Sequence, residues 1–444
     1  MDDWIRHAIW WQVYPLGATG AEREALPPGA AARSRLTQLQ AWLPHLVGLG
    51  CNGLALGPVF ESSTHGYDTV DHLCVDRRLG TEQDLQDLID ACHARGVQVL
   101  LDGVFNHVGR DFPRFREVLE QGPDAPAASW FDIDASRPGP DGFGYRDFEG
   151  HSALVALDHG NPEVAEHVAR VMTYWCDRGV DAWRLDAAYA VPPAFWREVL
   201  PRVREQHPDV WVVGEVLHGD YARYVADSGV DSVTQYELWK AVWSSLNDRN
   251  LFELAHALRR HGEMVRAFLP QTFVGNHDVT RLASRLDDGR HLPLALALLF
   301  ALPGIPTVYY GDEFGLRGVK EDRAGGDDAV RPRLPESAEP PGPEAVAIAD
   351  LHRLLIGVRR RHPWVADAAI EEPDVLSNDV LAVRLTSGGN TLAVVLNVGD
   401  APAEVCLPLS EGSVLAGQAE LAGHGDSTAV LVPPHAFALI GRGG

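Results

Sequence analysis

The sequence EQDLQDLIDACHARGVQVLLDG, residues 82–103, joins an amphipathic segment to a short apolar run and thereby indicates the fold. Gly96 marks the end of the predicted helix, because glycine readily adopts the left-handed conformation that follows many helices. The run VQVLLDG is almost continuously apolar, which predicts a strand buried on both faces of a parallel sheet. The apolar residues at the spacing of one helix face are Leu85, Leu88, Ile89 and Cys92.

The same unit of amphipathic segment, glycine or proline, and apolar run recurs along the chain. Eight apolar runs of this kind predict eight strands. Over this length they favour an α/β fold of the (β/α)8 TIM barrel type over an open doubly wound sheet. The predicted strands lie at residues 11–14, 53–56, 98–102, 181–186, 211–215, 232–236, 272–276 and 307–310.

Two parts of the sequence depart from this repeat. Residues 108–160 are rich in Gly, Pro, Asp and aromatics and follow the third predicted strand, so we expect a small inserted lobe there. After residue 366, short alternating strands surround the turn SGGN, which predicts a C-terminal antiparallel β-sandwich domain over 366–444. The barrel is then expected to comprise residues 1–107 and 161–365.

The composition limits the classes of partner. The chain has 444 residues and a formal net charge of -24 without a cluster of Lys and Arg, so no nucleic acid partner is expected. The longest apolar run, residues 292–310, is broken by Pro303, Gly304 and Pro306, which predicts a buried helix and strand and no membrane span. The N-terminus lacks the pattern of a secretory signal and the five cysteines are widely spaced, so the expected location is cytoplasmic.

Carboxylates follow several of the predicted strands. In a barrel of this type the carboxyl ends of the strands form one rim, where residues distant in sequence meet. Crowded like charges reduce stability, which makes a functional cluster the better interpretation of such a rim. The acids in these positions are Asp102, Asp186, Glu215 and Asp278.

Three reactions use a rim of acids. A two-metal hydrolase needs more histidine ligands and usually an acidic first strand, whereas the first predicted strand ends in QVYPLG. A metallophosphoesterase shares GNHD, residues 275–278, but needs companion histidine motifs that we do not find. Both metal-dependent interpretations are therefore weak.

Glycoside hydrolysis needs two carboxylates, which lie about 5 Å apart when the anomeric configuration is retained. Asp186 and Glu215, which end adjacent predicted strands, suit this requirement. Arg184 precedes Asp186 by two residues and thus shares its strand face. We expect the guanidinium to orient that aspartate and to hold it ionised.

Four segments, in order at these strand ends, resemble the motifs of the α-amylase family of glycoside hydrolases. They are DGVFNH (102–107), GVDAWRLDAA (179–188), GEVLH (214–218) and FVGNHD (273–278). The resemblance covers essentially the whole chain. It implies that Asp186 is the nucleophile, Glu215 the general acid/base and Asp278 the third carboxylate. The implied substrate-binding residues are Tyr67, His107, Arg184, His218, His277, Asp327 and Arg331.

Within that family, three segments are most similar to the neopullulanase and cyclomaltodextrinase branch. They are SWFDI (129–133), YRDFEGHSAL (145–154) and RLDAAYAVPPAFWREV (184–199). The implied substrate is a neutral α-glucan oligosaccharide, short or cyclic, with cyclic maltosyl-maltose as one candidate. Trp130 is a further candidate for substrate binding, since an aromatic ring at the edge of the lobe can stack on a sugar.

Departures from the family pattern keep alternatives open. Leu217, Tyr189 and Ala190 differ from common family residues on the leaving-group side, so the bond preference and the balance of hydrolysis and transglycosylation are open. The usual N-terminal β-domain of the branch is missing, so dimerisation through that domain is not expected. A non-catalytic family member acting as an interaction partner is the alternative from another class, against which the three acids count.

The resemblance implies no required cofactor. Asn106 is similar to a position that ligates calcium in many amylases, which leaves a calcium site open. No other metal site is expected from the sequence.

Overall fold

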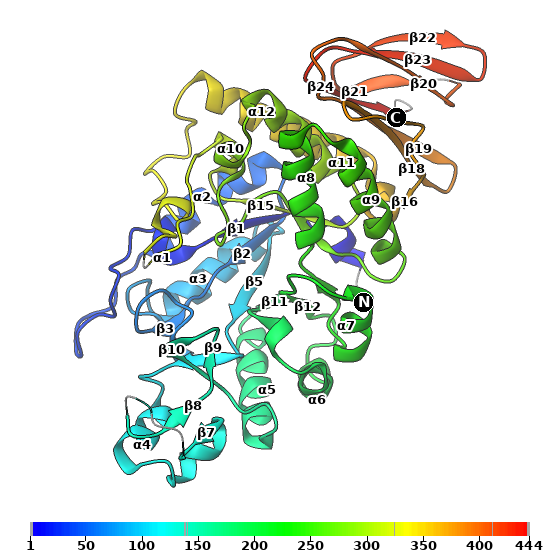
Figure 1. Cartoon of the computed structure of the whole chain (residues 1–444). Helices are drawn as coiled ribbons and strands as arrows, with labels where there is room; N and C mark the ends of the chain where they lie inside the picture. The colour runs from blue at the N-terminus through cyan, green and yellow to red at the C-terminus, as the bar shows by residue number, and fades with distance from the viewer. Residues whose placement is uncertain (1–2, 137–138, 140, 324, 411, 442–444) are drawn as a thin grey trace.

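The barrel predicted from the sequence is present in the computed structural model, which describes residues 3–136, 139, 141–323, 325–410 and 412–441. The outermost residues of the predicted domains, 1–2 and 442–444, lie outside this description. Eight parallel strands form one sheet in the order β13-β12-β11-β5-β2-β1-β15-β14 (Figure 1). A parallel bridge between Thr234 and Gln271 joins the two edge strands, so the predicted (β/α)8 barrel is confirmed.

The barrel strands follow the predicted runs closely but are shorter at the sixth and seventh positions. Thr234 lies outside the sixth strand because the chain turns there into α8, where the Gln235 side chain accepts a hydrogen bond from the Leu238 amide at 3.2 Å. The strands are β1 (Trp10–Val13), β2 (Gly53–Leu56), β5 (Gln98–Gly103), β11 (Ala182–Leu185), β12 (Trp211–Gly214), β13 (Ser232–Val233), β14 (Gln271–Phe273) and β15 (Ile305–Tyr309).

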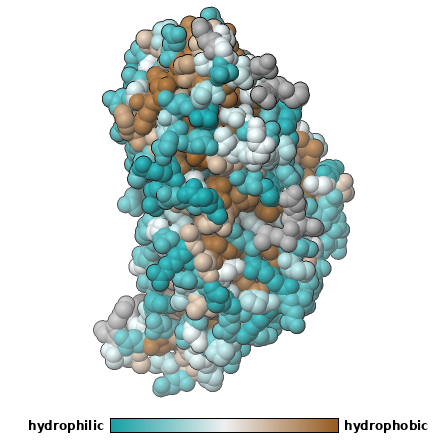
Figure 2. Space-filling view, turned by 90° about the vertical axis from the view of Figure 1, so that its right-hand side faces the viewer, coloured by the Kyte–Doolittle hydropathy of each residue, from teal (hydrophilic) through white to brown (hydrophobic). Residues whose placement is uncertain are grey.

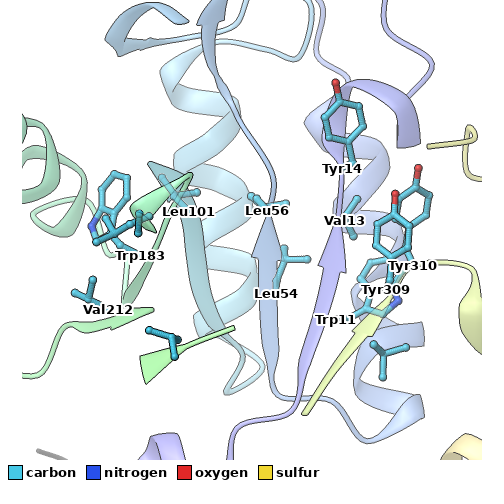
Figure 3. Close-up of a cluster of buried hydrophobic side chains, with 14 of the residues drawn as sticks. Trp11, Val13, Tyr14, Leu54, Leu56, Leu101, Trp183, Val212, Tyr309 and Tyr310 are labelled. Atoms are coloured by element: carbon cyan, nitrogen blue, oxygen red, sulfur yellow. The ribbon is translucent and has the colours of Figure 1, made fainter. Parts of the chain in front are cut away.

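Helices surround the sheet, as expected for a parallel barrel. The apolar faces of these helices pack on the outward-facing side chains of the strands, of which Trp11, Leu54 and Leu101 are shown in Figure 3. The helices are α1 (Pro15–Ala18), α2 (Leu36–Leu49), α3 (Glu82–His93), α4 (Pro113–Gln121), α5 (Pro162–Cys176), α6 (Pro193–Arg204), α7 (Tyr221–Ser228), α8 (Tyr236–Asp248), α9 (Leu251–Val265), α10 (Leu282–Arg285), α11 (Leu292–Ala301) and α12 (Pro343–Arg361).

The interior of the barrel is layered, apolar near the amino ends of the strands and polar above. Trp10 and Trp211 stack in the lower layer, with ring centroids 5.9 Å apart. Gly53 is required opposite Trp10, because a Cβ there would lie 2.4 Å from the indole ring. The next layer contains Gln12 and Arg184 and lies directly beneath the acidic rim.

A lobe follows β5, at the lower left of Figure 1, where the sequence predicts an insertion. Its small sheets contain β6 (His107–Gly109), β10 (His151–Ala156) and β9 (Asp147–Phe148), and separately β7 (Ile133–Asp134) with β8 (Gly144–Tyr145). A hairpin of β3 (Phe60–Ser62) and β4 (Thr69–Val75) follows β2.

The C-terminal domain consists of two antiparallel sheets that share a core, which confirms the predicted sandwich. Its strands β21 and β24 contact α12 and α11 of the barrel. One sheet contains β16 (Ala369–Ile370), β17 (Val375–Leu376), β18 (Val380–Ser387), β19 (Asn390–Asn397), β24 (Ala436–Gly441) and β21 (Ser413–Gly417). The other contains β20 (Ala403–Leu407), β23 (Ser427–Val432) and β22 (Glu420–His424).

The apolar run at 292–310 forms α11 and β15, as predicted. Among the described residues, no helix combines the length and apolar character that crossing a bilayer requires. The face of the molecule seen in Figure 2 is mostly hydrophilic, with apolar side chains in scattered patches.

Candidate active site

A cleft of about 950 Å³ opens above the barrel interior at the carboxyl ends of the strands. The three acids proposed from the sequence, Asp186, Glu215 and Asp278, all line it. Other parts of its wall come from the lobe and from the loop after β15. A cleft of this size at this end of a barrel is the usual place for a substrate.

The strand register places Asp186 and Glu215 next to each other. Leu185 of β11 pairs with Gly214 of β12, so the two acids follow at the same level of neighbouring strands. The Glu215 amide donates to the Leu185 carbonyl at 2.9 Å, which continues the pairing into the acidic pair. Adjacent strands lie about 4.8 Å apart, so this register sets the two backbones at a spacing that suits the close carboxyl pair of a retaining glycosidase.

Arg184 joins the acids from beneath. Its Nη1 donates to both carboxylate oxygens of Asp102, at 2.8 and 2.7 Å, and to Asp186 Oδ1 at 3.3 Å. Its Nη2 forms an ion pair with Glu215 Oε1 at 2.8 Å. All four side chains are buried, so this guanidinium is the cation that stabilises the cluster.

The pKa of Asp186 is raised, although Arg184 was expected to hold this aspartate ionised. Burial raises the pKa of Asp186; Arg184 opposes this shift, and the nearby carboxylates of Glu215 and Asp102 add to it. Arg184 therefore favours the ionised form, as expected, but burial and like charges outweigh it in the ligand-free cleft. For Asp278 burial also raises the pKa, but His277, Arg331 and Arg184 outweigh it and shift the pKa below its usual value.

Glu215 is held by groups that the sequence did not single out. The Tyr236 hydroxyl donates to Glu215 Oε1 at 3.1 Å, and the amide of Ala187 donates to Oε2 at 3.0 Å. Ala187 has a φ of 46°, an uncommon left-handed conformation for alanine that directs its amide toward Glu215. Asn276 in turn donates to the Tyr236 hydroxyl at 2.9 Å.

Of the GNHD side chains, Asp278 lines the opposite wall, while His277 lies beneath the cleft in the same layer as Gln12 and Arg184. His277 Nε2 lies 2.9 Å from Asp278 Oδ2 and also contacts the Tyr67 hydroxyl. Arg331 Nη2 donates to Asp278 Oδ1 at 2.8 Å and pairs with Asp327 at 3.1 Å. The structure therefore brings Asp327 and Arg331, from the loop after β15, to the third carboxylate.

Tyr67 and His107 line the same cleft. The Tyr67 hydroxyl donates to Asp102 at 3.2 Å, and its ring lies parallel to that of His277 with centroids 5.6 Å apart. His107 stacks on Phe148 of the lobe, and its buried Nε2 has no hydrogen-bond partner. Burial lowers the pKa of His107 to about 3, so this nitrogen belongs to a neutral imidazole that is free to contact a polar ligand.

Four expected binding residues do not line the cleft: Arg184 and His277 lie in the layer beneath it, and Trp130 and His218 lie elsewhere. The expectation for Trp130 is wrong, because its ring is 5% exposed and packs inside the lobe, where Nε1 donates to Glu163 at 2.9 Å. Arg114 covers the ring at 4.8 Å from its centroid. His218 is exposed and does not line the cleft, whereas its neighbour Leu217 does.

The cleft wall also contains Glu149 of the lobe, whose carboxylate accepts a hydrogen bond from the Tyr189 hydroxyl at 2.6 Å. Tyr189 is one of the positions where the sequence departs from the family pattern. That departure was the only feature of the sequence that drew attention to this contact. Glu149 and Tyr236 carried no signal, since their roles depend on long-range packing.

Asn106, the candidate calcium ligand, is held by two hydrogen bonds. Its amide nitrogen donates to His107 Nδ1 at 3.0 Å, and its backbone carbonyl accepts from the Leu157 amide at 3.1 Å. Within the described part of the chain, no group of three His, Cys, Asp or Glu at metal-ligating separation includes residues beside Asn106. Calcium binding stays a prediction, and no chemical step considered below depends on it.

Comparison with known proteins agrees with this geometry. The sequence model of the family described as "Alpha amylase, catalytic domain" matches residues 36–339. The chain is 34% identical to a cyclomaltodextrinase of Bacillus sp over 71% of this chain and 60% of that protein. It is 31% identical to neopullulanase 2 of Thermoactinomyces vulgaris over 81% of this chain and 63% of that protein. The chain thus spans somewhat less than two thirds of both relatives.

Solved structures are similar over nearly the whole chain. The ligand-free cyclic α-maltosyl-(1→6)-maltose hydrolase of Arthrobacter globiformis superposes with a TM-score of 0.83 at 27% identity, covering 99% of this chain and 100% of that one. The debranching enzyme of Nostoc punctiforme superposes with a TM-score of 0.83 at 27% identity, covering 99% of both chains.

Proposed function

Because the chain belongs to the α-amylase family of glycoside hydrolases, we propose that it hydrolyses the α-glucosidic bonds of short or cyclic α-glucans with retention of configuration. The observation that carries this proposal is the pair Asp186 and Glu215, at one level of adjacent strands and on one cleft. Two such acids suit a double displacement.

In the first step, the Asp186 carboxylate attacks the anomeric carbon while Glu215 transfers its proton to the departing glycosidic oxygen. A covalent glycosyl ester forms on Asp186, and the shortened sugar leaves. In the second step, Glu215 removes a proton from water, whose oxygen displaces Asp186 and releases the sugar hemiacetal. Each step exchanges one bond at the anomeric carbon, so two inversions retain the configuration.

The remaining cleft residues hold the sugar ring. Asp278, kept ionised by Arg331 and His277, accepts hydrogen bonds from sugar hydroxyls as positive charge develops on the ring. The unpartnered Nε2 of His107 is placed for another hydroxyl. Tyr67 presents a ring against which the sugar stacks.

The shape of the cleft supports a small substrate. Arg23, from the segment after α1, and Asp328, from the loop after β15, form an ion pair and both line the cleft. The segment after α1 and the loop after β15 thus meet at the wall of the cleft, and we infer that this contact limits the number of glucose units that bind. The name of one relative, cyclomaltodextrinase, agrees with a small cyclic substrate.

Asp186→Asn and Glu215→Gln test the roles of the two acids. We expect both variants to lose at least about 10²- to 10⁴-fold in kcat, the usual contribution of a positioned acid or base. Glu215→Gln should recover most of its first-step rate on a maltosyl fluoride, because fluoride leaves without protonation, whereas Asp186→Asn should not. Ordinary turnover of either variant on every α-glucan cleaved by the parent would overturn the assignment.

Initial rates on starch, pullulan, cyclodextrins and cyclic maltosyl-maltose test the substrate class. We expect the cyclic or short substrates to be preferred and the α-anomer to appear first by NMR. A preference for raw starch would contradict the proposed cleft, and a β-anomer would contradict the double displacement. Products longer than the substrate would reveal transglycosylation.

A further inference from the structure

Three potential metal ligands meet where the barrel contacts the C-terminal domain. Asp288 and His291 lie in the turn that leads into α11, and His435 lies in the turn between β23 and β24. We propose that these three side chains bind one Zn²⁺ ion that links the two domains. None of them lines the cleft, so this site is separate from the proposed chemistry.

The ligand atoms already lie near the separations that zinc requires. His291 Nε2 and His435 Nδ1 are 3.0 Å apart, and His435 Nδ1 is 3.9 Å from Asp288 Oδ2. The three ligand atoms all lie within 4.8 Å of one another. Ligands at about 2.0–2.2 Å from a tetrahedral zinc are roughly 3.3–3.6 Å apart, so shifts of less than about 1 Å complete the site.

A neighbouring carboxylate fixes the ring of His435 for metal binding. His435 Nε2 lies 2.8 Å from Asp400 Oδ1, and an ionised carboxylate only accepts hydrogen bonds. In the neutral ring this contact places the proton on Nε2 and directs the lone pair of Nδ1 at His291. A carboxylate behind a histidine ligand is a recurrent feature of zinc sites, where it orients the ring and raises its basicity.

The ring of His291 is incompletely paired without a cation. Its Nε2 faces the unprotonated Nδ1 of His435, so only a proton or a metal ion relieves the repulsion between the two lone pairs. When that proton sits on Nε2, the buried Nδ1 is left without a hydrogen-bond partner. Zinc binding moves the ring proton from Nε2 to Nδ1, and the carbonyl of Leu246 acts on this ring as an acceptor.

Burial and charge around the three ligands suit an ion with one open position. The His435 side chain is 5% exposed, whereas that of Asp288 is 26% exposed, so water can supply the fourth ligand on the Asp288 side. Arg290 donates to both carboxylate oxygens of Asp288, to Oδ1 at 3.0 Å and to Oδ2 at 2.6 Å, but its side chain is 59% exposed and can leave Oδ2. This arginine can keep one carboxylate oxygen while the ion takes the other.

Such an ion would link the turn that precedes α11 to the turn between β23 and β24 of the sandwich, since His435 lies 144 residues after His291. Because a bound ion stabilises only the state that presents all its ligands, zinc should stabilise the docked arrangement of the domains. The sequence did not reveal the site, since a lone Asp and His three residues apart gain a third ligand only through the tertiary fold.

Zinc titration of the full chain tests this inference. After removal of metals by a chelator, the protein competes for Zn²⁺ with a chromophoric chelator. We expect one equivalent to bind the parent and the His256→Gln control, whose histidine is exposed and unrelated to the site. His291→Gln and His435→Gln should each lose this equivalent. Co²⁺ should give the visible absorption of a tetrahedral nitrogen and oxygen site in the parent and in the His256→Gln control, and not in the two variants of the site.

Two further variants keep the test decisive if a histidine variant does not fold. Asp400→Asn should weaken Zn²⁺ binding by about 10- to 100-fold, the usual effect of losing a carboxylate behind a histidine ligand. Zn²⁺ should also raise the Tm of the parent more than that of Asp288→Asn. The proposal would be overturned if the parent bound no stoichiometric Zn²⁺, or if these variants bound Zn²⁺ as the parent does. The two histidines would then share only a proton.

Discussion

Arg184 determines the arrangement of the acids at the cleft. One buried guanidinium contacts Asp102, Asp186 and Glu215, so each carboxylate is positioned by the same cation. Asp102 itself does not line the cleft and therefore acts through Arg184 and Tyr67. Breaking a buried ion pair leaves an uncompensated charge, which makes every member of this cluster sensitive to substitution.

Asp102→Asn tests this positioning role. The carboxylate of Asp102 raises the pKa of Asp186 by repulsion, so removing its charge should lower that pKa. We expect the acidic limb of the kcat/KM profile to move to lower pH, together with a fall in kcat of about tenfold or more from the lost charge-assisted bond. Asp90→Asn, an exposed change of the same kind on α3, should leave the profile unchanged.

Trp130→Ala tests whether this tryptophan packs the lobe or binds sugar. Truncating a buried tryptophan typically reduces the free energy of unfolding by about 3–5 kcal/mol. We expect urea unfolding to show a loss of this size, while KM stays near the parent value wherever the variant is folded. Phe148→Ala, which removes the ring stacked on His107 at the cleft, should instead raise KM. A selective rise in KM for Trp130→Ala would contradict the packing role.

At the scale of elements, the sequence predicts most of the barrel because its signals are local. The helix and strand at 82–103 and the apolar strands that end in acids follow from spacing, glycine placement and continuous burial. The rim acids could be proposed for the same reason, since parallel strands bring their carboxyl ends together. The direction of Trp130 and the contacts of Glu149 and Tyr236 could not, because packing between distant segments decides them.

The capping box of α3 offers a prediction at this scale. Asp84 Oδ2 accepts the Thr81 amide at 2.7 Å, and the Thr81 hydroxyl accepts the Asp84 amide at 3.2 Å. Thr81→Ala removes the hydroxyl and should reduce the free energy of unfolding by about 1 kcal/mol. Thr81→Ser should retain nearly all of it in the same urea titration. Both variants should keep the parent kcat, since α3 contributes no side chain to the cleft.

At the scale of the whole molecule, buried neutral histidines connect stability to pH. Burial lowers the pKa of His107 and His167 to about 3 and that of His261 to about 4. In the unfolded chain, histidine titrates near 6.5. Between pH 6.5 and about 4 the unfolded state therefore binds protons that the folded state does not. The contribution of these histidines to the free energy of unfolding is complete above pH 6.5. It is lost as the pH falls toward their pKa values in the folded state.

Urea unfolding at pH 7.5, 6 and 5 should accordingly show a falling free energy of unfolding. Each of these histidines contributes a slope of up to about 1.4 kcal/mol per pH unit well below 6.5. Asp312 has the opposite effect, because burial raises its pKa to about 6 and the folded state therefore holds this proton more tightly than the unfolded state. Its contribution to the free energy of unfolding is lost as the pH rises. Asp186, whose pKa burial also raises, acts in the same direction as Asp312, so these carboxylates offset part of the slope from the histidines.

His167→Phe isolates the contribution of one histidine to this slope. The ring of His167 packs against Phe112 and Trp130, while its nitrogens lie 3.4 Å from His72 Nδ1 and from Arg170 Nη2. Phenylalanine therefore keeps the ring packing and removes the titrating nitrogens. We expect the variant to lose less stability than the parent between pH 6 and 5, by up to about 1.4 kcal/mol. Parallel curves for parent and variant would mean that His167 takes up its proton equally in both states. The acid sensitivity of the fold would then have to come from groups other than this imidazole.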